Sequence, residues 1–124
     1  MKLLIELSYA IIGCAYKVHS ELGPGLLEST YETYLEYKLI KKGLHVERQK
    51  HLPIVYSNVV LDNRYRVDLM VERKIIVEIK SCESIPPIYE AQLLTYLKLA
   101  GIKLGLLLNF NVKNLQKGII RRVM

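Results

Sequence analysis

The sequence has little of the chemistry that builds zinc centres or disulfide scaffolds. It contains no tryptophan, one phenylalanine and two cysteines, Cys14 and Cys82, which stand outside any CxxC spacing. The three histidines are scattered through unlike segments. This distribution argues against a zinc site. A disulfide between the two cysteines stays open on sequence alone, although two unpaired thiols in a reducing compartment are the simpler interpretation.

The sequence also lacks a long apolar run. A helix needs roughly 20 apolar residues to span a bilayer, and no stretch approaches that length. Lys2 and the apolar residues 3–15 resemble a short export signal, but the carboxylate of Glu6 interrupts them and the apolar positions recur at three- to four-residue steps. That spacing is typical of an amphipathic helix. We therefore expect a soluble cytoplasmic protein that makes no membrane contact.

Acidic residues are the minority charge. Lys and Arg number 18 against 12 Asp and Glu, which gives a formal net charge of +6 and a pI near 9.3. A basic chain favours an anionic partner, and nucleic acid is the commonest one. With 124 residues, of which 51% are hydrophobic, the chain suits a single domain over residues 1–124 with its own core.

Apolar spacing and turn residues predict an α/β fold. Helices are expected over residues 4–22, from directly after residue 25 to Gly43, and over residues 89–100 with Gly101 as terminator. Strands are expected over residues 46–50, 52–56, 59–61, 66–71, 75–80, 104–110 and 119–123. Pro53 marks an edge or a bulge. The almost wholly apolar run 104–110 is typical of a buried strand parallel to its neighbour, reached through a crossover helix.

The chain is organised around residues 66–80, which predict a β-hairpin. Two alternating runs are separated by a short charged connector, residues 72–74. If that connector is a three-residue loop, Val71 pairs with Ile75, and counting outward sets Asp68 opposite Glu78 and Arg66 opposite Lys80. Side chains alternate along a strand, so two groups are expected on opposite faces. One group is Val67, Leu69, Val71, Val77 and Ile79, and the other is Asp68, Glu78 and Lys80.

Two carboxylates placed opposite each other repel, so something must offset their charge. Lys80 supplies one positive charge, and Mg²⁺ or Mn²⁺ is the other candidate because these ions bind carboxylate oxygens together with water and phosphate. The first hypothesis is therefore a catalytic metal site. Its alternative is a solvated strand face held by cross-strand ion pairs, and the D…ExK pattern taken alone favours that alternative.

The residues that precede the hairpin add a second motif. GLLESTY at residues 25–31 matches the pattern GxxExxY. Further matching blocks follow at residues 43–44, 65–69, 77–80, 90–97 and 107–110. From Val18 onward the chain therefore resembles the GxxExxY family, a group similar to RecB-like members of the PD-(D/E)xK nuclease superfamily. The resemblance implies a restriction-endonuclease-like core, in which helices flank a mixed β-sheet.

The resemblance also implies roles for individual residues. Asp68 and Glu78, with the backbone carbonyl of Ile79, would hold Mg²⁺ or Mn²⁺, and Glu28 would complete the metal site from its helix. Lys80 would orient the attacking water and stabilise charge on the phosphoryl oxygens. Gln92 and Tyr96 match the QxxxY element and would contact the reacting groups or the nucleic-acid strand. Tyr89 departs from the family pattern, which has histidine there, so no acid-base role follows for it.

Each role has a structural alternative. Glu28 would also suit the positive end of its helix, Gln92 and Tyr96 would also suit a surface pair, and Tyr31 and Tyr34 are better interpreted as core residues than as stacking platforms. The basic C-terminal third either tracks a phosphate backbone or is solvated: Lys98, Lys103, Lys113, Lys117, Arg121 and Arg122.

The leading prediction is a metal-dependent nuclease that hydrolyses phosphodiester bonds, with DNA as the expected substrate and a homodimer as a compatible assembly. The alternative is a non-catalytic nucleic-acid-binding or protein-interaction module that retains the nuclease fold. Retention of Glu28, Asp68, Glu78 and Lys80 together favours the first over simple decay.

Overall fold

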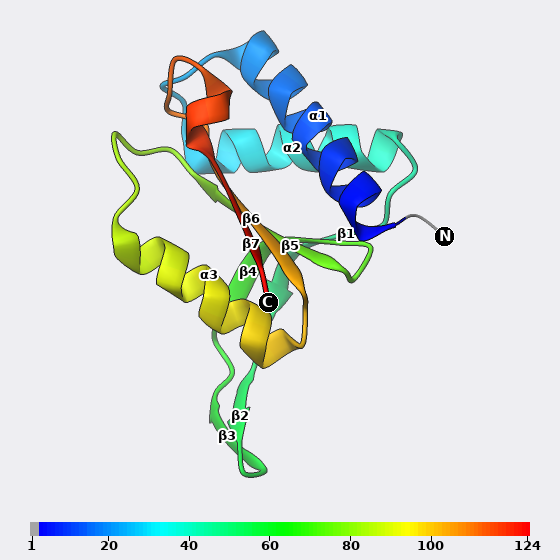
Figure 1. Cartoon of the computed structure of the whole chain (residues 1–124), viewed down its shortest axis with the longest axis vertical. Coiled ribbons are helices and arrows are strands. Elements are labelled where there is room, and N and C mark those ends of the chain that lie inside the picture. Colours follow the sequence, from blue (N-terminus) through cyan, green and yellow to red (C-terminus); the bar gives the residue numbers. More distant parts are fainter. Residues whose placement is uncertain (1–2) are drawn as a thin grey trace.

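A five-stranded sheet lies at the centre of the computed structural model, which describes residues 3–124 (Figure 1). The strand order is β1-β4-β5-β6-β7. The strands are β1 Val46–His51, β4 Arg66–Val71, β5 Ile75–Lys80, β6 Leu104–Asn109 and β7 Ile119–Val123. Only the β5–β6 pair is parallel, and the other pairs are antiparallel. The predicted mixed sheet and its buried parallel strand are confirmed.

Helices cover both faces of the sheet. α1 (Leu4–Leu22) and α2 (Glu28–Lys41) lie on one side, and α3 (Pro87–Ala100) lies on the other (Figure 1). Each side has its own cluster of buried side chains, one under α1 and α2 and one under α3. The sheet therefore separates two apolar layers, and strand β5 contributes Val77 and Ile79 to the first and Ile76 to the second.

Helix α1 has the predicted bounds. Its apolar stripe, which includes Leu7, Ile11 and Val18, is buried against the first cluster, as expected for an amphipathic helix. Gly23 ends the helix with a φ of 72°, a region that glycine enters at little cost. Lys2 of the export-like stretch lies outside the described residues. Among residues 3–124, no helix combines the length and the hydropathy that a membrane crossing requires.

Tyr31 anchors the turn between α1 and α2. Its hydroxyl donates to the Gly23 carbonyl at 2.6 Å and accepts from the Leu26 N–H at 3.1 Å. Its ring stacks on Phe110 with centroids 4.6 Å apart. The side chain is fully buried, so the interpretation of Tyr31 as a core residue is confirmed. Gly25, the glycine of the GxxExxY pattern, has a φ of 96° and allows the chain to turn. Tyr31, the tyrosine of the pattern, holds that turn through its two hydrogen bonds.

Helix α3 packs very close to strand β6. A Cβ atom on Gly105 would lie 2.8 Å from Cδ1 of Leu93, well inside van der Waals contact. Leu93 is fully buried in the second cluster. Glycine at position 105 therefore lets the helix approach the sheet. The helix begins at Pro87, two residues before the predicted start, and ends at Ala100 as predicted. The predicted terminator, Gly101, adopts the left-handed conformation.

The central hairpin has the predicted register near its loop. Val71 pairs with Ile75, and Leu69 pairs with Val77. The ladder between β4 and β5 ends there, so the predicted pairs Asp68–Glu78 and Arg66–Lys80 are not part of it. On the other edge of β4, Arg66 pairs with His51 of β1. Val67 was predicted on the face of Leu69, but it packs in the second cluster. Both corrections have one cause, since side-chain carboxylates replace backbone partners where β4 and β5 separate.

Strands β2 (Ile54–Tyr56) and β3 (Val59–Asp62) form a separate two-stranded sheet. It projects from the rest of the molecule in Figure 1. Ser57 and Asn58 make the predicted turn with φ values of 51° and 63°, the signs of a type I′ hairpin. The register shifts between Ile54 and Val55, next to the proline that predicted a bulge. A short 3-10 helix, Leu115–Gly118, was not predicted.

The two thiols are not joined. Cys14 is buried and Cys82 is half-buried, and both are free. This arrangement agrees with two unpaired thiols, and the reducing compartment stays a prediction.

Candidate active site

Asp68 and Glu78 face each other where strands β4 and β5 separate. The Asp68 N–H donates to Oε2 of Glu78 at 2.7 Å, and the Ile79 N–H donates to Oδ2 of Asp68 at 2.8 Å. Each carboxylate thus accepts a hydrogen bond from the main chain of the opposite strand. The reciprocal contacts hold the two acids side by side, as the register arithmetic predicted, but through carboxylate contacts rather than a continued ladder.

The two acids share a low-polarity environment. Glu78 is only 6% exposed, and burial together with the charge of Asp68 raises its pKa to about 8. Burial also raises the pKa of Asp68, and the charge of Glu32 adds to that rise. The N–H donors and Lys80 oppose both shifts without cancelling them. The pair therefore favours any species that places positive charge between its oxygens.

Lys80 lies at the end of β5 with its ammonium group over the ring of Tyr89, 4.2 Å from the ring centroid. Its charge lowers the pKa of Asp68 and Glu78, which places it within electrostatic reach of both acids. Tyr89 therefore holds the lysine by a cation–π contact. This gives the residue that departs from the family pattern a physical role that sequence reasoning did not assign.

Gln92 and Tyr96 lie one turn apart on α3. Tyr96 is buried, and its pKa is raised by burial and by the charges of Glu78 and Asp68. Its ring also meets Tyr65 edge to face at a centroid distance of 6.4 Å. Tyr96 is therefore near the acids rather than part of a surface pair. Gln92 is half-buried, and its predicted contact with the reacting groups stays a prediction.

Helix α2 carries two acids, Glu28 and Glu32, and they differ in their relation to the pair. Glu28 is exposed and begins the helix, and its charge adds to burial in raising the pKa of Cys82. It therefore lies toward the end of β5, where Ser81 Oγ also donates to the Leu26 carbonyl at 2.7 Å. Glu32, one turn further along, acts on the pKa values of both Asp68 and Glu78. Sequence reasoning did not single out Glu32.

Glu32 is bound from two sides by residues of β1. Arg48 Nε donates to its Oε2 at 2.5 Å, and Gln49 Nε2 donates to its Oε1 at 3.0 Å. Gln49 Nε2 also lies 3.2 Å from Oδ1 of Asp68. The signal for Glu32 was available, because it stands four residues after Glu28 and so on a similar helix face. Gln49 gave no such signal, since its contacts depend on its backbone conformation.

Ile79 contributes its main chain to this arrangement, while its side chain is fully buried in the first cluster. Its N–H is the group that binds Asp68. The metal-ligand role of its carbonyl oxygen stays a prediction.

One of the basic C-terminal residues already has an acidic partner within the protein, because Arg122 forms an ion pair with Glu90 at 2.7 Å.

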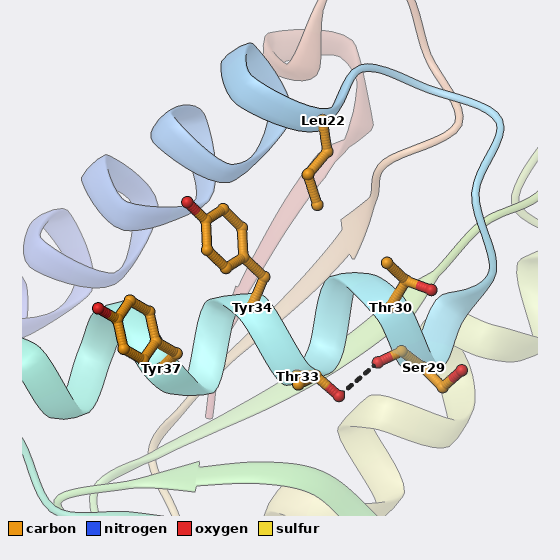
Figure 2. A pocket seen from close by; sticks show the side chains of 6 residues that line it. All are labelled: Leu22, Ser29, Thr30, Thr33, Tyr34 and Tyr37. Carbon is orange, nitrogen blue, oxygen red and sulfur yellow. Dashed lines mark hydrogen bonds between the residues drawn. The ribbon is translucent and has the colours of Figure 1, made fainter.

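An open groove between α1 and α2 is a separate feature (Figure 2). Its lining consists of Leu22, Ser29, Thr30, Thr33, Tyr34 and Tyr37. Thr33 Oγ1 donates to the Ser29 carbonyl at 2.9 Å, so that hydroxyl is already engaged. Tyr34 is half-buried and packs against the first core cluster while its ring also lines this groove, so it belongs to the margin of the core. The lining offers neither a carboxylate nor a cation, so the candidate site is the acidic pair.

The donors at the acidic pair fit a hard divalent cation. Asp68 and Glu78 offer carboxylate oxygens. Burial and neighbouring negative charge disfavour the ionised forms of both groups, and a bound cation would stabilise those forms. Mg²⁺ commonly binds through one or two carboxylates and completes its shell with water and phosphate. Within residues 3–124, no three Cys, His, Asp or Glu side chains converge closely enough to form a metal cage. The fit is thus to a two-carboxylate site with Glu32 at its margin, and the predicted contribution of Glu28 to the metal site stays a prediction.

Comparison with known proteins bears on the same residues. The family model of the PD-(D/E)XK nuclease superfamily matches residues 5–123, a range that includes every residue of the site described above. Neither the curated proteins nor the solved structures give a match. The five-stranded mixed sheet between α1–α2 and α3 agrees with a restriction-endonuclease-like fold. Sequence match and architecture agree, and the chain belongs to the PD-(D/E)XK nuclease superfamily.

Proposed function

We propose that this protein is a metal-dependent nuclease that hydrolyses phosphodiester bonds, with DNA as its substrate. The observation that carries the proposal is the buried pair of Asp68 and Glu78 beside Lys80, within a chain that belongs to a nuclease superfamily. The net charge of +6 supports a polyanionic substrate.

The acids have the binding role in this proposal. Asp68 and Glu78 hold Mg²⁺ or Mn²⁺ with the carbonyl of Ile79, and Glu28 approaches from the start of α2. When bound, the cation polarises the phosphate and lowers the pKa of water. The main-chain donors fix the two carboxylates beforehand, since the N–H groups of Asp68 and Ile79 each hold one of their oxygens. Pre-positioned ligands reduce the ordering that binding requires.

Lys80 stabilises the negative charge that develops on the phosphoryl oxygens and orients the attacking water. Its position over the Tyr89 ring keeps the ammonium near the acids without a carboxylate contact of its own at hydrogen-bond distance. Gln92 and Tyr96 of α3 lie on the same helix face and contact the nucleic-acid strand or the reacting groups.

The two unpaired thiols suit a cytoplasmic location, and a homodimer would extend the footprint on DNA.

A metal-dependence panel tests the proposal. Purified protein is incubated with single- and double-stranded DNA and RNA, with Mg²⁺, with Mn²⁺ or with chelator. We expect cleavage of DNA that requires the cation and that is lost in Asp68→Asn, while Asp62→Asn, the same chemical change in the separate β2–β3 sheet, retains it. Binding of DNA without cleavage under every condition would instead support the non-catalytic module.

A further inference from the structure

Gln49 of strand β1 bridges a carboxylate of helix α2 and a carboxylate of strand β4. Its amide nitrogen donates to Glu32 of α2 at 3.0 and 3.1 Å and to Oδ1 of Asp68 of β4 at 3.2 Å. Glu32 is only 6% exposed, so its carboxylate depends on these partners and on Arg48. A single amide group thus lies between one acid of the candidate site and one acid at its margin.

The backbone at Gln49 supports a specific role for this side chain. Its φ is 51° within strand β1, a conformation that a non-glycine residue adopts only where its surroundings stabilise it. The neighbouring residues Arg48 and Lys50 still pair regularly with Leu69 and Val67 of β4. The left-handed conformation is therefore confined to the one residue that contacts both acids.

The amide hydrogens of Gln49 supply partial positive charge to Asp68. Asp68 accepts two hydrogen bonds, one from the main chain of Ile79 at Oδ2 and one from Gln49 at Oδ1. A carboxylate oxygen has two lone pairs, so a cation can bind Oδ1 beside the N–H donor, but the hydrogen bond withdraws negative charge from that oxygen. Gln49 therefore weakens the attraction of Oδ1 for a cation, whereas its contact with Glu32 does not involve that oxygen.

We propose that Gln49 is a positioning residue that holds Asp68 and Glu32 together and weakens the attraction of Oδ1 of Asp68 for a divalent cation. This inference rests on the proposed function, because it requires Asp68 to bind the cation. Gln49 accordingly lowers the metal affinity of the site and stabilises the arrangement of its acids when no cation is bound.

Calorimetric titration with Mn²⁺ in the absence of nucleic acid tests whether Gln49 lowers the metal affinity of the site. The variant Gln49→Met keeps the side-chain length and loses the donor, and Gln116→Met makes the same change at an exposed position. We expect Gln49→Met to bind Mn²⁺ roughly tenfold more tightly than wild type, with Gln116→Met unchanged. Gln49→Gly, which suits the positive φ, should show the same tightening if the methionine variant fails to fold.

The titration distinguishes a failure of the role of Gln49 from a failure of the proposed function. Equal or weaker Mn²⁺ binding by the Gln49 variants overturns the role of Gln49 and leaves the nuclease proposal intact. Absence of Mn²⁺ binding by wild type overturns both. A double-mutant cycle of Gln49→Met with Asp68→Asn, measured by thermal unfolding with chelator, tests the bridge without any metal. Strictly additive shifts in melting temperature would also refute the bridge.

Discussion

Replacing Glu78 with glutamine is expected to change how the stability of the fold depends on pH. In the folded protein the pKa of Glu78 is raised from 4.5 to about 8 by burial and by Asp68. Between these values the folded state binds more protons than the unfolded state. The free energy of unfolding therefore falls as pH rises through this window, and the stabilisation from the protonated carboxyl is lost above about pH 8.

The structure sets a ceiling on the effect. A span of about 3.5 pH units corresponds to about 5 kcal/mol, at about 1.36 kcal/mol for each unit. Asp68 titrates together with Glu78, so the measured loss in wild type between pH 5 and 8 is expected to be about 2 to 5 kcal/mol. Glutamine keeps the acceptor for the Asp68 N–H and carries no charge, so Glu78→Gln should be nearly flat over the same range.

Urea denaturation at half-unit pH steps from 5 to 8.5, with chelator present, measures this difference from the midpoints at constant m-value. Glu83→Gln makes the same chemical change at an exposed position and should follow wild type. Mg²⁺ should flatten the wild-type profile, because a bound cation favours the ionised carboxylates. Parallel profiles for wild type and Glu78→Gln would refute the reasoning, since they would mean that Glu78 ionises alike in both states.

Three further outcomes are expected. Lys80→Ala should reduce cleavage at least about 100-fold, the effect of removing a donor that stabilises developing charge, with DNA affinity nearly unchanged; wild-type cleavage by this variant would exclude the proposed role of Lys80. Tyr89→Leu should lower cleavage by about three- to tenfold through loss of a cation–π contact worth about 0.5–1 kcal/mol or more, while Tyr89→Phe retains it; equal rates for both variants would show that the ring does not position Lys80. Gly105→Ala should lower the free energy of unfolding by about 1–3 kcal/mol because the new methyl group meets Leu93, and a urea midpoint equal to that of wild type would contradict the close approach of α3.

The parts of the fold that follow local rules could be predicted from the sequence. The bounds of α1, the loop of the central hairpin and the pairing of Val71 with Ile75 all follow from periodicity and turn chemistry. The predicted face of Val67 was wrong, because the alternation rule assumes a continuous ladder and the carboxylates of Asp68 and Glu78 interrupt it.

From the sequence, only the part of the candidate site that lies within the central hairpin could be predicted. Asp68, Glu78 and Lys80 come together because one hairpin carries all of them. Glu32 is brought to the site by packing of α2 on β1, and its only sequence signal is its spacing of four residues from Glu28. Gln49 reaches the site through a left-handed conformation within a strand, which no composition or spacing indicates. Tyr89 likewise acquires its contact with Lys80 only once α3 has docked.

The exchange of main-chain hydrogen bonds by Asp68 and Glu78 has a consequence for interpreting any protein of this shape. These two side chains terminate a strand pair, so truncating either one leaves an N–H group without its acceptor at the middle of the sheet. A descendant that had abandoned catalysis would still need a hydrogen-bond acceptor at both positions, which the amides of Asn and Gln also supply. Acceptors retained at these positions would therefore reflect folding as much as catalysis, whereas Lys80 provides no such acceptor and would be replaced sooner.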